Sequence, residues 1–193
     1  MRLILASHNQ HKAREFERLL PGFEVEPYPG DLPQETGETF RENAELKAAH
    51  VYSALGGGVW VLADDSGIEA SALGGRPGVR SARFAGERAG DQQNLAALLA
   101  ALEHEPDRGV AYAAELVLIA PDGSRRYARG ELRGTLALSP RGGGGFGYDP
   151  AFIPEGETRT VGEMSAAEKD AISHRARAAA NLLAQLGGLS PPR

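Results

Sequence analysis

The pattern of apolar and polar residues along the 193-residue chain alternates between predicted strands and predicted helices. Residues 2–6 form a short apolar run that predicts a strand, and residues 12–20 carry apolar side chains at helical spacing. Residues 59–63 form a continuous apolar run, which is typical of a strand covered on both faces, and the run stops at Asp64 and Asp65. This alternation indicates an α/β protein.

The later segments extend the same pattern. Residues 73–90 predict a loop rich in Gly and Arg, and no internal repeat is visible. The other predicted elements are an edge strand at 23–28, a helix from the capping box of Thr39 and Glu42, a helix capped by Asp91, antiparallel strands at 110–120 and 125–138, and one long helix from the capping box of Ser165 and Glu168 to Gly187 and Gly188.

Composition narrows the class of protein. The chain has 21 basic and 26 acidic residues, a net charge of −5 and no cysteine, which excludes a disulfide framework and a thiolate metal site. With no long basic block, we expect no nucleic-acid partner. No apolar run approaches the roughly 18 residues of a membrane span, and the N-terminal run is too short for a signal peptide, so we expect a cytoplasmic protein without a membrane partner.

Asp64 and Asp65 are the first candidate for chemistry. Ligand sites in open α/β sheets lie beyond the carboxyl ends of strands, so two carboxylates there are suited to a hard divalent cation. Adjacent like charges are unfavourable unless a cation or a proton offsets them. The alternative is that one aspartate caps the following turn while the other is solvated.

A polar segment connects the first predicted strand to the first predicted helix. Backbone amides at a helix N-terminus attract anions, and a lysine one turn into the helix adds positive charge. The segment lacks the glycines and the Lys-Ser/Thr pair of a Walker A loop, which argues against a P-loop ATPase or kinase. A phosphate-binding segment and a polar turn with capping side chains remain open. Its residues are Ser7, His8, Asn9, Gln10, His11 and Lys12.

Lysine is rare in this chain, and its positions are informative. Of the 21 basic residues only Lys12, Lys47 and Lys169 are lysine. Lys12 and Lys169 lie near the starts of predicted helices, and Lys47 lies on the apolar stripe of another. Three compact ammonium groups favour a polyphosphate site. For Lys47, the alternative is a stem on apolar surface with its head in water.

The glycine run at residues 142–145 precedes a candidate base pocket. Glycines allow close backbone approach, and two aromatic side chains beside an aspartate offer a stacking face and an acceptor for a base. The alternative is a flexible hairpin with two core aromatics. The residues are Phe146, Gly147, Tyr148 and Asp149. His174 and Arg175 carry donors for a carbonyl or phosphate, or else they lie on a solvated helical face.

In this order, the segments resemble the inosine triphosphate pyrophosphatase family. The matching segments are residues 7–12 with Glu15, 35–37, 39–40, 42–44 with Lys47, 63–67, 72–78 with 81–84, 144–150, and 168–169 with 172–175. The resemblance implies Mg²⁺-dependent hydrolysis of ITP, dITP and XTP to the nucleoside monophosphate and pyrophosphate. It also implies one domain over residues 1–193, an α/β fold with two lobes around a long central mixed β-sheet, an active-site cleft between the lobes, and a homodimer.

The resemblance assigns roles by motif position. Asp65 is the implied general base and metal ligand, with Glu35 and Asp64 as further metal ligands. His8 stands where relatives commonly carry a small residue. The implied substrate contacts are Ser7, His8, Asn9, Gln10, His11, Lys12, Lys47, Ser66 and Lys169 for the phosphates, and Phe146, Gly147, Tyr148, Asp149, His174 and Arg175 for the base.

Two other functions compete with this hypothesis. A phosphatase of the haloacid-dehalogenase type also places an aspartate after a strand, but its Asp-x-Asp motif is missing here. A non-catalytic nucleotide sensor would bind ITP with Mg²⁺ and release no product.

Overall fold

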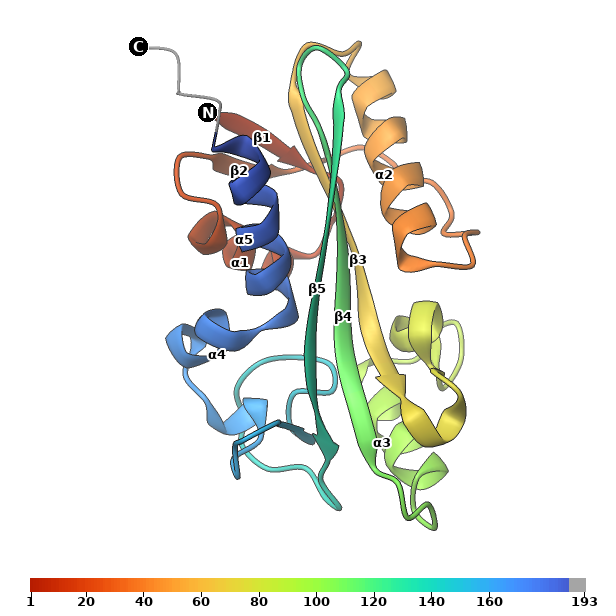
Figure 1. Ribbon diagram of the computed structural model, residues 1–193. Coiled ribbons are helices and arrows are strands. Elements are labelled where there is room, and N and C mark those ends of the chain that lie inside the picture. Colours follow the sequence, from red (N-terminus) through yellow and green to blue (C-terminus); the bar gives the residue numbers. More distant parts are fainter. Residues whose placement is uncertain (188–193) are drawn as a thin grey trace. The chain divides into compact units, whose positions relative to one another are not determined.

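The computed structural model describes residues 1–187 and confirms the α/β class (Figure 1). The strands are β1 (Arg2–Leu5), β2 (Glu24–Pro27), β3 (Trp60–Ala70), β4 (Gly109–Ile119), β5 (Arg125–Leu136) and β6 (Phe152–Pro154). The α-helices are α1 (Gln10–Leu19), α2 (Phe40–Ala54), α3 (Asp91–Ala101), α4 (Ala166–Ile172) and α5 (His174–Leu186), and the 3₁₀ helices are η1 (Ser71–Leu73), η2 (Gly78–Arg83) and η3 (Val161–Glu163).

The strands form a mixed sheet in the order β2-β1-β3-β4-β5-β6. β1 pairs in parallel with both β2 and β3, whereas β5 and β6 are antiparallel. β2 lies at an edge of the sheet, as predicted from Pro27 and Pro29. The antiparallel strand pair predicted around the turn at Asp122 corresponds to β4 and β5.

The chain divides into two compact units, and each is described by itself. Unit 1 contains residues 1–65, 114–130 and 175–187, and unit 2 contains residues 66–113 and 131–174. The chain leaves unit 1 after Asp65 and returns to it at Arg175. Candidate site residues therefore occur in both units, next to the two positions named above where the chain passes from one unit to the other.

Unit 1 has a core on each face of its part of the sheet, as β1 illustrates. Side chains alternate between the faces of a strand. Leu3 and Leu5 pack in a cluster with residues of α1 and α5, whereas Ile4 and Ala6 pack with residues of α2. Helices α1 and α5 therefore cover one face of this part of the sheet, and α2 covers the other (Figure 1).

Unit 2 has a hydrophobic cluster of its own. It combines Leu95 and Leu98 of α3 with strand residues such as Ile68, Tyr112 and Phe152. The cluster holds the far ends of β3, β4 and β5 together with β6, and so supports the loop that contains the glycine run.

Four details of the predicted elements are wrong. β3 does not stop at the aspartates. The long C-terminal helix is two helices, because Ser173 between them has extended backbone angles of φ −62° and ψ 155°. Gly90, not Asp91, is the N-cap of α3, and its amide donates to the side chain of Gln93. The predicted loop 73–90 contains η2. Gly188, one of the predicted helix-ending residues, lies outside the described residues.

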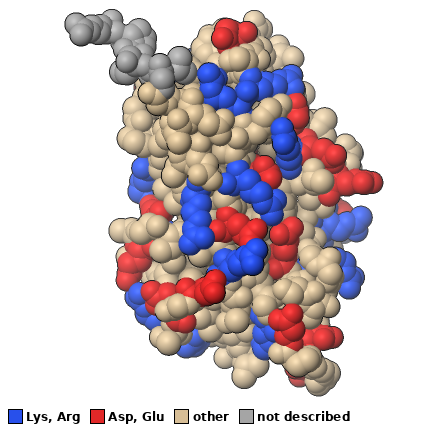
Figure 2. Space-filling view, in the orientation of Figure 1, with Lys and Arg blue, Asp and Glu red and all other residues tan. Residues whose placement is uncertain are grey.

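Charge on the surface is mixed in sign. On the face drawn in Figure 2, Lys and Arg side chains are interspersed with Asp and Glu side chains. Among residues 1–187, no helix combines the length and the apolar character that a membrane span requires.

Candidate active site

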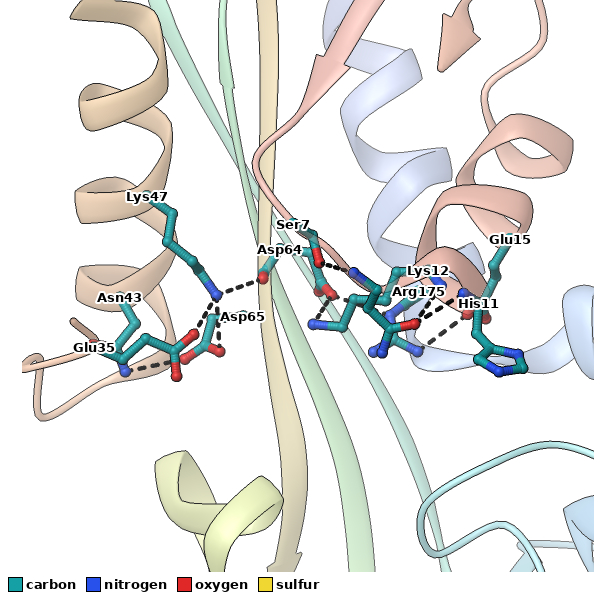
Figure 3. A network of polar contacts seen from close by, with 11 residues as sticks. Ser7, His11, Lys12, Glu15, Glu35, Asn43, Lys47, Asp64, Asp65 and Arg175 are labelled. Atoms are coloured by element: carbon teal, nitrogen blue, oxygen red, sulfur yellow. Dashed lines mark hydrogen bonds and ion pairs between the residues drawn. The ribbon is translucent and has the colours of Figure 1, made fainter. Parts of the chain in front are cut away.

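Asp64 and Asp65 are consecutive residues in the middle of β3, so their side chains point to opposite faces of the sheet (Figure 3). The prediction of a strand end is wrong for β3 itself, but the pairing of β3 with β1 does end here. Leu5, the last residue of β1, lies opposite Leu62. The two carboxylates thus lie just beyond the carboxyl end of β1, where α/β sheets commonly bind ligands.

On the α2 face, the ammonium group of Lys47 lies between two carboxylates. Its Nζ is 2.7 Å from Glu35 Oε1 and 3.3 Å from Asp65 Oδ1, and it donates to the backbone oxygen of Asp64 at 2.9 Å. Asn43, one turn earlier on α2, donates from Nδ2 to Asp65 Oδ2 at 3.1 Å. Lys47 is buried, so the alternative that its head lies in water is wrong.

The start of α2 fixes the position of the loop that carries Glu35. Thr39 caps the helix, and Glu42 completes the predicted capping box. Asn43 Oδ1 accepts a hydrogen bond from the amide of Gly37 at 2.7 Å. Asn43 therefore ties this loop and Asp65 to the same helix.

Burial and charge oppose each other at this cluster. Burial raises the pKa of Asp65 above its ordinary value, although the ammonium of Lys47 acts to lower it. Burial lowers the pKa of Lys47, but the carboxylates of Asp65 and Glu35 outweigh burial, so this pKa is raised. At neutral pH, Lys47 is therefore an ammonium group held by acidic neighbours.

On the opposite face, Asp64 belongs to a buried network of four charged side chains. Lys12 Nζ lies 2.7 Å from Asp64 Oδ2, and Arg175 Nε donates to the same oxygen at 3.2 Å. Arg175 Nη1 donates to Glu15 Oε2 at 3.1 Å. Asp64, Glu15 and Arg175 are only 1%, 2% and 3% exposed. The alternative that Arg175 lies on a solvated helical face is wrong.

The ion pairs with Lys12 and Arg175 change the pKa of Asp64. Burial acts to raise the pKa of Asp64, but Lys12 and Arg175 together hold it well below its usual range. Burial lowers the pKa of Lys12, against the effect of Asp64. Asp64 thus pairs with Lys12 and Arg175, whereas Lys47 lies within ion-pair distance of both Asp65 and Glu35. No group of three or more potential metal-ligating side chains occurs within residues 1–187.

The polar segment 7–12 caps α1. Asn9 is the N-cap residue, and its Oδ1 accepts from the amides of His11 and Lys12. Ser7 Oγ accepts from the amide of Asn9 at 3.1 Å, and His8 Nε2 forms a hydrogen bond with the backbone oxygen of Gly30 at 2.8 Å. Gln10 is the first residue of α1. The capping roles expected of Ser7 and Asn9 are present, while phosphate contact by this segment stays a prediction.

In unit 2, the carboxylate of Asp149 receives three donors. Lys169 Nζ lies 2.8 Å from Oδ2, and the amide of Phe146 donates to the same oxygen at 2.9 Å. Tyr112 donates from its hydroxyl to Oδ1 at 3.1 Å. The ammonium of Lys169 also lies 4.3 Å from the centre of the Phe146 ring, within the range of a cation–π contact.

The other residues after the glycine run are held by local contacts. Tyr148 is buried in the hydrophobic cluster and donates to the backbone oxygen of Ser81 at 2.7 Å, as a core aromatic would. The amide of Gly147 donates to Asp91 Oδ2 at 2.8 Å, and Gly147 has a φ of +62°, which favours glycine. Tyr148 and Gly147 therefore fix the loop from which Phe146 and Asp149 extend.

His174 is buried and stacks on Tyr112, with ring centroids 4.7 Å apart and an interplanar angle of 12°. A solvated position for His174 is therefore wrong. Its partner Tyr112 was not among the predicted site residues, because a tyrosine within an apolar strand carries no signal that distinguishes it from a core residue.

The structure thus brings Lys12 and Lys47 to the aspartate pair in unit 1, and Lys169 to Asp149 in unit 2. Ser66 follows Asp65 in β3 as the first residue of unit 2. The predicted site residues do not include Glu15, Asn43 and Tyr112. Sequence spacing could have found the first two, because Asn43 lies four residues before Lys47, and Glu15 three after Lys12, on the same helical faces.

Fold and site together define an α/β protein whose buried acidic and lysine side chains suit an anionic ligand with a divalent cation. More particularly, the chain belongs to the Ham1 family, whose sequence profile matches residues 3–185.

Curated relatives and solved structures match this chain over nearly its whole length. The dITP/XTP pyrophosphatase of Mycobacterium tuberculosis H37Rv is 46% identical, covering 98% of this chain and 97% of that protein. That of Deinococcus deserti is 46% identical, covering 99% and 92%. The Ham1 protein of Staphylococcus aureus matches with a TM-score of 0.87 at 36% identity, covering 98% of this chain and all of the other. The nucleoside-triphosphatase / dITP/XTP pyrophosphatase of Mycobacterium abscessus matches with a TM-score of 0.75 at 40% identity, covering 95% and 99%.

Proposed function

We propose that this protein hydrolyses the non-canonical purine nucleoside triphosphates ITP, dITP and XTP, with Mg²⁺ as cofactor. Each turnover consumes one water and yields a nucleoside monophosphate and pyrophosphate, which removes deaminated purines from the nucleotide pool. The observation that carries the proposal is the convergence of Glu35 and Asp65 on one ammonium group, that of Lys47. The relatives named dITP/XTP pyrophosphatase support this choice of substrate.

Glu35 and Asp65 are the residues that would hold Mg²⁺. Mg²⁺ prefers oxygen ligands and is commonly bound by one or two carboxylates together with substrate phosphates and water. The two carboxylates both lie within ion-pair distance of Lys47, and Asn43 ties the segments that carry them to one helix, so the donor set fits. When bound, the ion would offset phosphate charge and polarise phosphorus. We assign Asp64 to ion pairs with Lys12 and Arg175 instead.

Asp65 is the proposed general base. It would accept a proton from the water whose oxygen forms a bond to the α-phosphorus, while the bond from that phosphorus to the bridging oxygen breaks and pyrophosphate leaves with the electron pair. Its raised pKa makes Asp65 a stronger base than an exposed aspartate. Asn43 fixes the orientation of its carboxylate. Lys12 and Lys47 supply positive charge for the phosphates.

Residues of unit 2 are proposed to recognise the base. Hypoxanthine and xanthine carry a proton on N1 and a keto oxygen at position 6, whereas adenine carries neither. Asp149, when ionised, only accepts hydrogen bonds, so it favours a base with a proton on N1. Donors such as His174 favour the keto oxygen. Adenine offers neither an N1 proton to Asp149 nor a keto oxygen to His174, which is a basis for rejection.

The test is a panel of triphosphates incubated with and without Mg²⁺. We expect pyrophosphate and monophosphate from ITP, dITP and XTP, little turnover of ATP, and no activity in excess EDTA. Stepwise release of orthophosphate would instead identify a phosphatase, and binding of ITP without turnover would identify a sensor. Either result would overturn the proposal.

Two further properties rest on the family resemblance. We propose a homodimer, to be checked by light scattering coupled to size-exclusion chromatography, where a mass near 20.4 kDa would refute it. We propose a cytoplasmic location, which cell fractionation tests.

A further inference from the structure

Tyr112 lies in β4 of unit 2 and touches two residues of the proposed base-recognition group. Its hydroxyl donates to Asp149 Oδ1 at 3.1 Å, and its ring stacks on His174. The ring also stacks on Phe152, at a centroid distance of 4.5 Å and an interplanar angle of 28°. A single buried side chain therefore connects the loop at residues 146–149 with His174, the first residue of α5, within unit 2.

The hydroxyl separates this role from ordinary core packing. Phenylalanine would give the same stacking on His174 and Phe152. Unlike tyrosine, it has no buried polar atom that needs a hydrogen-bond partner. The hydroxyl of Tyr112 finds its partner in Asp149, whose other oxygen already accepts from Phe146 and Lys169.

The three donors fix how the carboxylate is turned. With only the two donors on Oδ2, rotation about the bond between Cβ and Cγ would let Oδ1 move. The hydrogen bond from Tyr112 sets the position of Oδ1 and leaves that oxygen a second lone pair for a ligand donor. The stacking contact sets the plane of the His174 ring at the same time.

We propose that Tyr112 is a positioning residue for purine selectivity, acting through the carboxylate of Asp149 and the imidazole of His174. This inference rests on the proposed function, because it assumes that Asp149 and His174 face the base. It predicts that Tyr112 affects the choice between bases more than it affects cleavage of the phosphoanhydride.

The test compares Tyr112→Phe with Tyr127→Phe in the full-length protein. Tyr127 is the matched control, because its hydroxyl also donates to a carboxylate at 3.1 Å, that of Glu45, outside the proposed site. The quantities to measure are kcat and KM for ITP and ATP with Mg²⁺, and the urea midpoint of each variant.

For Tyr112→Phe we expect the ratio of kcat/KM for ITP to that for ATP to fall about tenfold, the effect of one well-placed hydrogen bond. This loss should come mainly from KM for ITP, with kcat changed less than about twofold. Tyr127→Phe should keep the wild-type ratio. Tyr112→Leu, which also loses the stacking contact, should lower the ratio further.

The proposal is overturned if Tyr112→Phe keeps the selectivity of the wild type. It is also overturned if activity on ITP and ATP falls by the same factor, since that is the mark of a structural role only. If the wild type releases no pyrophosphate from any triphosphate, the proposed function fails instead. The binding constants of the same variants for ITP and ATP then decide the role of Tyr112 separately.

Discussion

The charged network of unit 1 and the Asp149 cluster of unit 2 use similar residues but hold their carboxylates in different ways. In unit 1, Asp64 and Asp65 are matched by Lys12, Lys47 and Arg175 through buried ion pairs. In unit 2, Asp149 has one ammonium partner and is otherwise held by a hydroxyl and a backbone amide among stacked rings.

The difference matches the two parts of the proposed substrate. A triphosphate carries formal charge, and strong charge-assisted contacts in a low-dielectric site are suited to it. A purine has no formal charge and differs from its competitors by single hydrogen-bonding groups, so orientation matters more than charge. Changes in unit 1 should therefore alter cleavage or folding, and changes in unit 2 should alter selectivity.

The largest effect is expected from Asp65→Asn. The amide keeps the shape but removes a base and a metal charge, so kcat for ITP should fall by roughly a thousandfold or more. Pyrophosphate release measures this effect, and circular dichroism checks the fold. Asp31→Asn, the same change at an exposed aspartate, is the control. Turnover of Asp65→Asn within tenfold of the control would refute the assignment.

Arg175→Met tests the network on the other face of β3. The change removes the guanidinium group that pairs with both Glu15 and Asp64, so the free energy of unfolding should fall by about 3–5 kcal/mol. Urea denaturation measures the loss. Arg2→Met is the matched control. Arg2 forms an ion pair with Glu26 in which both side chains are exposed, so the stability of this variant should stay near that of the wild type. Equal stability of the two variants would show that the buried network contributes no more than a surface ion pair.

Asp149→Asn tests unit 2. The amide nitrogen can donate where the carboxylate only accepted, so the preference of kcat/KM for ITP over ATP should fall roughly 10- to 100-fold. Turnover of the preferred substrate at saturation should change much less. A variant that loses turnover at saturation but keeps its selectivity would contradict the division of labour between the units.

Some parts of this comparison could be predicted from the sequence. The presence of strands β1 to β5, the capping box at the start of α2 and the inward position of Lys47 follow from local periodicity and capping rules, whereas β6 was not predicted. The resemblance pointed to Glu35, which proves to share Lys47 with Asp65. These features depend on residues close together in the chain or on motifs of known order.

Other parts depend on tertiary contacts that local patterns do not encode. β3 continues through the aspartates because later strands still pair with it after β1 has ended. Because β3 continues, the side chains of Asp64 and Asp65 point to opposite faces of the sheet. The predicted strand end gave no reason to expect this arrangement. The hydrogen bond from Tyr112 to Asp149 joins residues 37 positions apart, and the sequence around either residue does not predict it.

The smallest effect is expected from His8→Ala. The His8 side chain is exposed and its Nε2 forms a hydrogen bond with the backbone oxygen of Gly30, which ties the segment before α1 to the chain that follows β2. Losing one exposed hydrogen bond should raise KM for ITP by no more than about threefold and leave kcat unchanged. His11→Ala in the same segment is the comparison. A large rise in KM for His8→Ala alone would place its imidazole on the phosphates, and would extend the charged region of unit 1 to a residue whose side chain contacts the backbone of Gly30 in the structure.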